Sequence, residues 1–426
     1  VAAINTAAVS GLTTDQVVAL TTAQADKLTA AQMGALTSVQ VGAIETADLA
    51  KLTTEQVAAI STAAVAGLTT TQMAKLSSEQ LTALTTAQTA ALSTANIAAL
   101  TTAQVDKLTT AQVAALTTTQ VKSMDAEDVA KLTTDQVGAL TTANVVALTT
   151  AQAAVITSAQ VGAMSTGQVR ALETADLAAM TTTAVAAFSA DQAAALTTAQ
   201  ARTLSASQLN ALSSDQIVKL ETTDVAALNA NTVSGMSTTN VKALGSEQVK
   251  ALTKAQLQSM TAAQFNAMDT VDVANLTTDQ INVLTATQVG GLSSSTLNAL
   301  TTGQLNTLSA AQLAGLTTGQ LNNLTTDKVV ALTTAQFKAL SGNQVNALSN
   351  TQIGKIETAD LASLTATTIS TLTSSTAAAL TTDQIQALTQ TQLASMSSVQ
   401  LNALTDLTKL STTQLSALKA DQLGKL

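Results

Sequence analysis

The sequence predicts an all-α solenoid in which each octapeptide forms one helix of about one and a half turns. Two observations lead to this fold class. The chain of 426 residues repeats with a period of eight, and nearly every repeat carries helix-starting residues at the same two positions. Such short helices are not stable alone, so they are expected to stack around a continuous core of Leu and Val side chains.

The period of eight is carried by two apolar positions. We label the octapeptide a to h, with a at Ile4 and at every eighth residue up to Leu404, and all fifty-one a residues are Leu, Ile, Met or Phe. Position f runs from Val9 to Leu401 and is polar only at Thr89. With the consensus L-T-T-A-Q-V-x-A, the residues at a and f are the expected core, and the small residues at h allow close packing of the helices.

Positions b and e carry the signal for the start of a helix. Position b is Ser or Thr in 42 of 51 repeats, and position e is Gln in 33 of 50. A Ser or Thr followed three residues later by Gln is a capping box, in which each side chain bonds the backbone amide of the other residue. The apolar residues at a and f then form the hydrophobic staple that accompanies it.

The charged residues follow the same helix. Acids concentrate at b, d and e, as at Asp15 and Glu55, where the positive end of the helix dipole favours them. Bases concentrate at g and h, as at Lys51 and Lys242, near the negative end. Most of the 17 Gly also lie at g or h, where a left-handed helix cap would use them.

Other folds fit the period less well. One continuous helix would wind the Leu column around its axis, because eight residues overshoot two turns by about 80°. In a flat strand, a and f would face opposite sides. A β-solenoid remains the structural alternative, because Thr and Val favour strands.

The register predicts the organisation of the chain. Residues 1–404 are expected to form one uninterrupted octapeptide solenoid. The register then slips by two residues and restarts at Leu410, Leu418 and Leu426, so residues 405–426 are expected to hold the slip and the final repeats.

Composition excludes several classes of function. The chain has no His, Cys, Trp, Tyr or Pro and only three Phe, so His-based and Cys-based catalysis, thiolate metal sites and disulfides are excluded. A net charge of −9 and the lack of aromatic platforms argue against nucleic acid. No apolar run is long enough to span a membrane. We therefore expect no enzyme activity, no cofactor and no membrane span.

One irregularity suggests a weak metal site. Asp replaces Gln at e six times, and in all six repeats b is also acidic, although b is acidic nowhere else. Two carboxylates three residues apart share a helical face and can be drawn together by Ca²⁺. The alternative is that one acidic repeat was duplicated. The pairs are Glu45 and Asp48, Asp125 and Asp128, Glu173 and Asp176, Glu221 and Asp224, Asp269 and Asp272, and Glu357 and Asp360.

The regular Thr residues are a second candidate surface. On a rigid solenoid they can match the spacing of ice or of another crystalline surface. Capping chemistry and a solvated outer corner already explain Thr at b, so this remains the alternative to a structural role.

The repeat resembles the ALTTAQ-type octapeptide arrays of large exported bacterial proteins, many of them adhesin-like. The segment from Ala99 to Val113, ALTTAQVDKLTTAQV, matches that pattern closely, and departures such as Gly245 at b and Lys328 at e affect single repeats. The resemblance covers nearly the whole chain. It implies an extracellular or cell-surface role and supplies no catalytic residues.

These observations together predict a structural protein. The repeats are expected to form a rod that serves as a filament, sheath, stalk or surface layer by self-association or end-to-end stacking. The alternative is a repeat binding module, either an adhesin arm stabilised by Ca²⁺ or an ice-binding surface. The sequence identifies no anchor at the cell surface.

Overall fold

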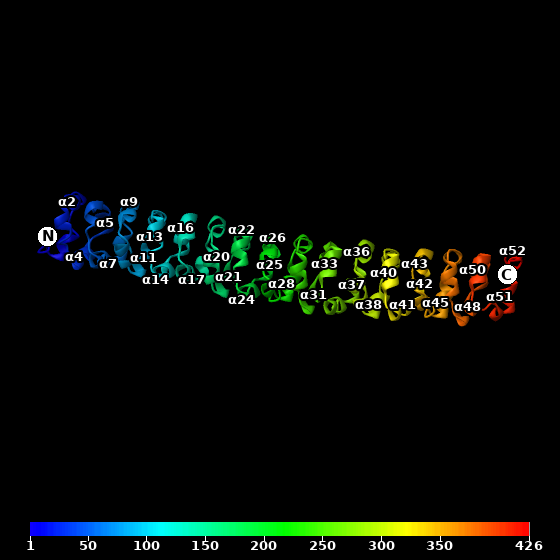
Figure 1. Cartoon of the computed structure of the whole chain (residues 1–426). Coiled ribbons are helices and arrows are strands. Elements are labelled where there is room, and N and C mark those ends of the chain that lie inside the picture. The colour runs from blue at the N-terminus through cyan, green and yellow to red at the C-terminus, as the bar shows by residue number, and fades with distance from the viewer. Residues whose placement is uncertain (426) are drawn as a thin grey trace. The chain divides into compact units, whose positions relative to one another are not determined.

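The protein is all-helical, as the sequence predicts. The computed structural model describes residues 1–425, and Leu426 lies outside the described residues. Within residues 1–425 there is no β-strand, so the β-solenoid alternative is wrong. Figure 1 shows short helices following one another throughout. The chain forms two compact units, Val1–Leu220 and Glu221–Leu426, although the octapeptide register runs through their boundary without a change.

The helices of the first unit recur once in each octapeptide. They are α1 (Thr6–Val9), α2 (Thr14–Val18), α3 (Thr22–Ala25), α4 (Ala30–Ala35), α5 (Ser38–Ala43), α6 (Thr46–Leu49), α7 (Thr54–Ala59), α8 (Thr62–Val65), α9 (Thr70–Lys75), α10 (Ser78–Ala83), α11 (Thr86–Ala91), α12 (Thr94–Ala98), α13 (Thr102–Val105), α14 (Thr110–Ala115), α15 (Thr118–Ser123), α16 (Ala126–Lys131), α17 (Thr134–Ala139), α18 (Thr142–Val146), α19 (Thr150–Ala153), α20 (Ser158–Ala163), α21 (Thr166–Ala171), α22 (Thr174–Ala179), α23 (Thr182–Ala186), α24 (Ala190–Ala194), α25 (Thr198–Thr203), α26 (Ala206–Ala211) and α27 (Ser214–Ile217).

The second unit continues the same series and includes one short 3₁₀ helix, η1. Its helices are α28 (Thr222–Ala227), α29 (Ala230–Ser234), α30 (Thr238–Lys242), α31 (Ser246–Ala251), α32 (Lys254–Ser259), α33 (Ala262–Ala267), α34 (Thr270–Asn275), α35 (Thr278–Asn282), α36 (Ala286–Gly290), α37 (Ser294–Ala299), α38 (Thr302–Asn306), α39 (Ala310–Ala314), α40 (Thr318–Asn323), α41 (Thr326–Val330), α42 (Thr334–Ala339), α43 (Gly342–Asn346), α44 (Asn350–Ile353), α45 (Thr358–Ser363), α46 (Ala366–Ser370), α47 (Ser374–Ala378), α48 (Thr382–Ala387), α49 (Gln390–Ser395), α50 (Ser398–Ala403), η1 (Leu407–Lys409), α51 (Thr412–Ser416) and α52 (Ala420–Leu423).

In most repeats the helix begins with the predicted capping box. At α20, Thr157 is extended, with φ −82° and ψ 161°, and its hydroxyl accepts a hydrogen bond from the Gln160 backbone amide. Gln160 Oε1 accepts a hydrogen bond from the Thr157 amide at 2.8 Å. The α-helices have only four to six residues, as the predicted length of about one and a half turns requires. None of the helices in residues 1–425 has the length and apolar character needed to cross a membrane.

The chain winds so that successive turns pack on one another within each unit. Each helix generally contacts the third helix along the chain, as α4 contacts α7, α17 contacts α20, and α42 contacts α45. Side chains at e reach backbone atoms 28 and 31 residues earlier, as Gln72 reaches Ile44 and Val41. One turn of the winding therefore takes between three and four octapeptides, and helices in neighbouring turns are staggered.

From Gln32 onward, this stagger places nearly every e glutamine over the end of a helix of the preceding turn. Gln72 is 2% exposed, and its Oε1 accepts from the Thr69 amide at 2.7 Å. Its Nε2 donates to the carbonyl oxygens of Val41 at 2.9 Å and Ile44 at 2.7 Å. The carbonyls at the end of a helix lack partners within that helix. One side chain therefore caps the start of its own helix and the end of a helix one turn away.

The core consists of the predicted apolar positions. Residues at a and f are buried in both units except near the two ends of the chain, where Ile4, Leu415 and Leu423 are exposed, and the largest fully buried side chains include Phe265 and Phe337. The buried polar residues lie at e, apart from Thr89 at f, whose hydroxyl donates to the Thr85 carbonyl. A typical repeat thus buries two apolar side chains and one hydrogen-bonded polar side chain.

Glycine allows close packing between turns and does not form the expected left-handed helix caps. No residue in the described part of the chain has a positive φ, so left-handed caps at g or h are wrong for this protein. Many helices instead end in an extended a residue, such as Met164 with φ −67° and ψ 142°, because the chain must enter the next N-cap at once. At Gly67, an added Cβ would lie 2.0 Å from the Ser38 carbonyl oxygen. The absence of a side chain there permits this close approach between turns.

The register slip is absorbed locally. The Asp406 carboxylate accepts the Thr408 amide at 3.1 Å, and η1 takes the place of a regular α-helix. Gln414 then reaches the carbonyls of Ile385 and Leu388, which lie 29 and 26 residues earlier, two fewer than elsewhere. The turn-to-turn bonds therefore continue after the slip.

We expect replacement of one e glutamine to destabilise the solenoid. In Gln264→Ala, the Thr261 amide loses its acceptor, and the Val233 and Met236 carbonyls lose their donor. The free energy of unfolding should fall by about 2–3 kcal/mol, measured by urea denaturation followed by circular dichroism.

The matched control is Gln258→Ala, which removes the same amide from an exposed position g in the same unit. Its effect should stay within about 0.5 kcal/mol. Equal effects of the two substitutions would contradict a special role for the e amide.

Candidate functional site

Replacements at e show what chemistry this position needs. Asn96 donates Nδ2 to the Leu68 carbonyl at 2.7 Å, and Asn144 donates to the Leu116 carbonyl at 2.8 Å. Both carbonyls belong to position a of the preceding turn and are the same acceptors that Gln uses elsewhere. The shorter amide thus keeps the bond between turns. We call the space between the e side chain and this a carbonyl the e slot.

Two further replacements keep a donor in the e slot. Thr368 donates its hydroxyl to the Leu340 carbonyl at 3.3 Å. At Lys328 the Nζ ammonium donates to the Leu300 carbonyl, again at position a of the preceding turn. The e slot therefore accepts a positive charge in place of a neutral amide.

The six acidic pairs depart from this rule. Each e aspartate is buried, with between 2% and 8% of its surface exposed, whereas the b acids are exposed. None of the six b carboxylates accepts a capping hydrogen bond from its own helix. The two acids of a pair thus have different surroundings: one lies between turns and the other faces water.

The pair Asp125 and Asp128 borders a pocket at the edge of α16. Leu100, Thr102 and Glu127 line the same pocket, and Leu100 is the a residue of the preceding turn. Burial raises the pKa of Asp128 to about 6, and the negative charges of Asp125 and Glu127 add to this shift. The pocket therefore places three carboxylates beside Leu100. The Leu100 carbonyl is the group to which a Gln or Asn at position e would donate a hydrogen bond.

The pair Glu173 and Asp176 borders an equivalent pocket. Leu148 and Thr150, at positions a and c of the preceding turn, line it together with Lys122. Asp176 is 2% exposed, and its Oδ2 has no hydrogen-bond partner. Burial raises the pKa of Asp176, a hydrogen bond from Thr150 opposes the shift, and the charge of Glu173 adds to it. Asp176, which lines this pocket, therefore carries one buried carboxylate oxygen without a hydrogen-bond partner.

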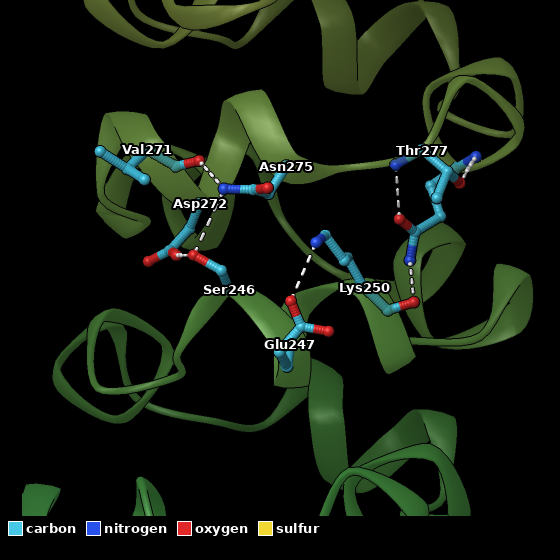
Figure 2. A network of polar contacts seen from close by, with 8 residues as sticks. Ser246, Glu247, Lys250, Val271, Asp272, Asn275 and Thr277 are labelled. Atoms are coloured by element: carbon cyan, nitrogen blue, oxygen red, sulfur yellow. Dashed lines mark hydrogen bonds and ion pairs between the residues drawn. The ribbon is translucent and has the colours of Figure 1, made fainter.

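A third pair shows the aspartate with a hydroxyl partner. Ser246, at position c of the preceding turn, donates to Asp272 Oδ1 at 2.6 Å and receives a bond from Asn275 Nδ2 at 3.4 Å (Figure 2). Asn275 also donates to the Val271 carbonyl at 2.8 Å. In Figure 2, Ser246 at the start of α31 points toward Asp272 on α34, so the contact joins neighbouring turns.

The six predicted pairs stay separate from one another. In residues 1–425 no three residues of the types Asp, Glu, His or Cys form a group able to hold a metal by themselves. Asp128, Asp176 and Asp272 instead meet residues of the preceding turn that offer backbone and hydroxyl oxygens. The prediction that these pairs bind Ca²⁺ stays a prediction.

The sequence analysis did not predict that the e side chain donates a hydrogen bond to a backbone carbonyl of the preceding turn. A capping box works with Glu as well as Gln, yet Glu never occurs at e in this chain. That preference for the amide was the available signal that the side chain must also donate a hydrogen bond. The identity of the acceptor, one turn earlier, depends on the winding and could not be read from the repeat.

The fold and its turn-to-turn bonds define a tandem-repeat protein with an all-α solenoid architecture. The sequence model of the ALTTAQ repeat matches residues 41–78, 81–118, 105–142, 129–166, 169–205, 217–254, 265–302 and 353–390. These segments together cover more than half of the chain, which therefore belongs to the ALTTAQ repeat family. A search of the curated proteins found no significant match.

We expect the buried Asp128 to make stability depend on pH. Its pKa is about 6 in the folded protein against an ordinary 3.8, so the folded state binds the extra proton between these values. Stability therefore decreases as the pH rises through this window. In Asp128→Asn this contribution should vanish, which melting curves recorded by circular dichroism at several pH values would measure.

Asp135→Asn is the control, because it removes an exposed acid from the following helix. Its pH dependence should run parallel to that of the wild type. Parallel curves for Asp128→Asn as well would contradict the role assigned to the buried carboxylate.

Proposed function

We propose that this protein is a non-catalytic structural component of a bacterial cell exterior, in which the number of repeats sets the reach of the solenoid. The observation that carries the proposal is the uniformity of the e slot. The same bonds, from Gln Nε2 to the f and a carbonyls of the preceding turn, recur from Gln40 in the first unit to Gln400 in the second. An arrangement repeated in this way suits a spacer better than a single reaction centre.

Self-association is part of the proposal. Each turn presents e amides toward one neighbouring turn and a and f carbonyls toward the other. Because the contacts between turns are non-covalent and recur at each step, a turn of one chain carries groups complementary to a turn of a second copy. The surface that extends the solenoid within one molecule is thereby suited to extend it between molecules, as a filament or surface layer.

The regular Thr residues at position b do not favour an ice-binding role, because they already have a function within the helix. The b hydroxyls accept hydrogen bonds from the backbone amides of the e residues in their own helices, as Thr157 does from Gln160. Capping thus accounts for Thr at this position, and the structural role is the function that the geometry supports best.

Assembly can be tested with the purified chain over a wide range of concentrations. We expect the sedimentation coefficient to rise with concentration and electron micrographs to show filaments, tubes or a lattice. A single species of 42.8 kDa at every concentration would contradict self-association and leave a monomeric spacer.

The proposed location has a separate test. Antibodies raised against the repeat array should label intact source cells, and external protease should remove the signal. Labelling only after the cells are opened would contradict a cell-surface role, whatever the outcome of the assembly experiment.

A further inference from the structure

The e slot is a place where a donor or a positive charge meets a backbone carbonyl. Gln72, Asn96 and Thr368 fill it with neutral donors, and Lys328 fills it with an ammonium group on the Leu300 carbonyl. The a carbonyl of one turn thus attracts a positive group from the next turn. Lys328 is a covalently attached example of a cation at this position.

Aspartate brings the opposite charge to the same place. Asn and Asp have side chains of equal length and shape, and the Nδ2 atoms of Asn96 and Asn144 lie 2.7 and 2.8 Å from their carbonyl partners. An ionised Asp there has only acceptor oxygens, so a carboxylate faces a carbonyl with no proton between them. A buried pair of acceptors of this kind is unfavourable unless a third group separates them.

Asp176, which lines one of the two pockets, has the kind of unsatisfied oxygen that is expected when two acceptors face each other. Asp176 Oδ2 is buried without a partner, although Thr150 and Leu148 line the same pocket. Glu173 borders the pocket from its exposed side. Lys122 also lines it, but its side chain is exposed and it forms no ion pair in the described chain.

The pocket at Asp128 contains the equivalent residues at a, b, c and e, and no lysine lines it. Leu100 and Thr102 occupy positions a and c of the turn before Asp128, as Leu148 and Thr150 do before Asp176. Asp125 and Glu127 provide two further carboxylates at the pocket. Every polar side chain that lines this pocket carries oxygen as its acceptor, and the net charge is negative.

We propose that four groups form a cation site that joins two turns: the buried e aspartate, the exposed b acid, and the a carbonyl and c hydroxyl of the preceding turn. The two best-formed sites contain Asp125 with Asp128 and Glu173 with Asp176. These oxygen ligands suit Ca²⁺, which accepts flexible coordination by six to eight oxygens, including water. A water molecule would link the ion to the exposed carboxylate. Mg²⁺ is less suitable, because it requires a nearly ideal octahedron.

A cation between turns also explains why b and e change together. In the capping box, the b hydroxyl bonds the e backbone amide and the e Oε1 bonds the b amide, so both residues serve the helix. In the acidic repeats the box is not formed, and the e carboxylate is available to a cation between turns. The b carboxylate then supplies the second negative charge that a divalent ion needs. The inference rests on these local contacts and does not depend on assembly or location.

Calorimetric titration of the metal-free chain with CaCl₂ tests the proposal. We expect dissociation constants of about 10⁻⁴–10⁻³ M, the range of extracellular Ca²⁺ modules, and a rise in melting temperature of roughly 2–5 °C at saturation. In the double variant Asp128→Asn with Asp176→Asn, the number of Ca²⁺ ions bound should fall by two. MgCl₂ at equal ionic strength separates specific binding from charge screening.

The double variant is expected to fold, because Asn occupies e at other positions of the native chain, and its circular dichroism spectrum checks this. The control, Asp135→Asn with Asp191→Asn, removes two exposed acids at position d and should keep the wild-type number of Ca²⁺ ions. Absence of binding to the wild type, equal effects of Mg²⁺ and Ca²⁺, or an unchanged ion number in the double variant would each overturn the proposal. Stability that changes with pH but not with Ca²⁺ would also overturn it, by showing that a proton occupies the e slot instead.

Discussion

The carboxamide of the e glutamine makes the connection on which the rest of the structure depends. A helix of four to six residues has hardly any internal hydrogen bonds, so its end groups need partners from elsewhere. At Gln72, Oε1 satisfies the start of α9, and Nε2 satisfies carbonyls at the end of α5 one turn away. Helix formation and the stacking of turns are therefore coupled through one side chain in most repeats.

This coupling makes each unit nearly one-dimensional in its energetics. A repeat interacts with its neighbours in the chain and with the turns before and after it, and the same contacts recur at each step. Stability then accumulates from repeat terms and interface terms. The apolar residues at a and f form the core, while the amide bonds carbonyls at the end of a helix in the preceding turn.

The e slot explains why different polar residues at position e have different structural consequences. Asn at e preserves the bond to the preceding turn, and Lys328 replaces a neutral donor with a charged one. Aspartate removes the donor altogether and leaves Asp176 with a buried oxygen that has no partner. The chain contains six aspartates at e, each with an acidic residue three positions earlier, so the replacement of the amide by a carboxylate is itself a repeated feature of the array.

The repeat alone determined the fold class, the core and the start of nearly every helix. These features are local: Thr157 and Gln160 are three residues apart, so their capping box follows from sequence spacing. The alternation of a and f likewise places Phe265 and Phe337 in the core without knowledge of the winding. The expectation of left-handed glycine caps was wrong, because the residue after a helix is either still right-handed, as at Ala66, or already extended toward the next N-cap, as at Met164.

Only the tertiary structure decided how many residues make a turn, and with it every contact between turns. That Asp176 and Leu148 line one pocket follows from the winding of the chain, which no local pattern encodes. The acidic pairs could be found in the sequence, but the pocket oxygens that face them could not. Local hydrogen bonds are set by spacing along the chain, whereas the e slot exists only after the chain has closed a full turn upon itself.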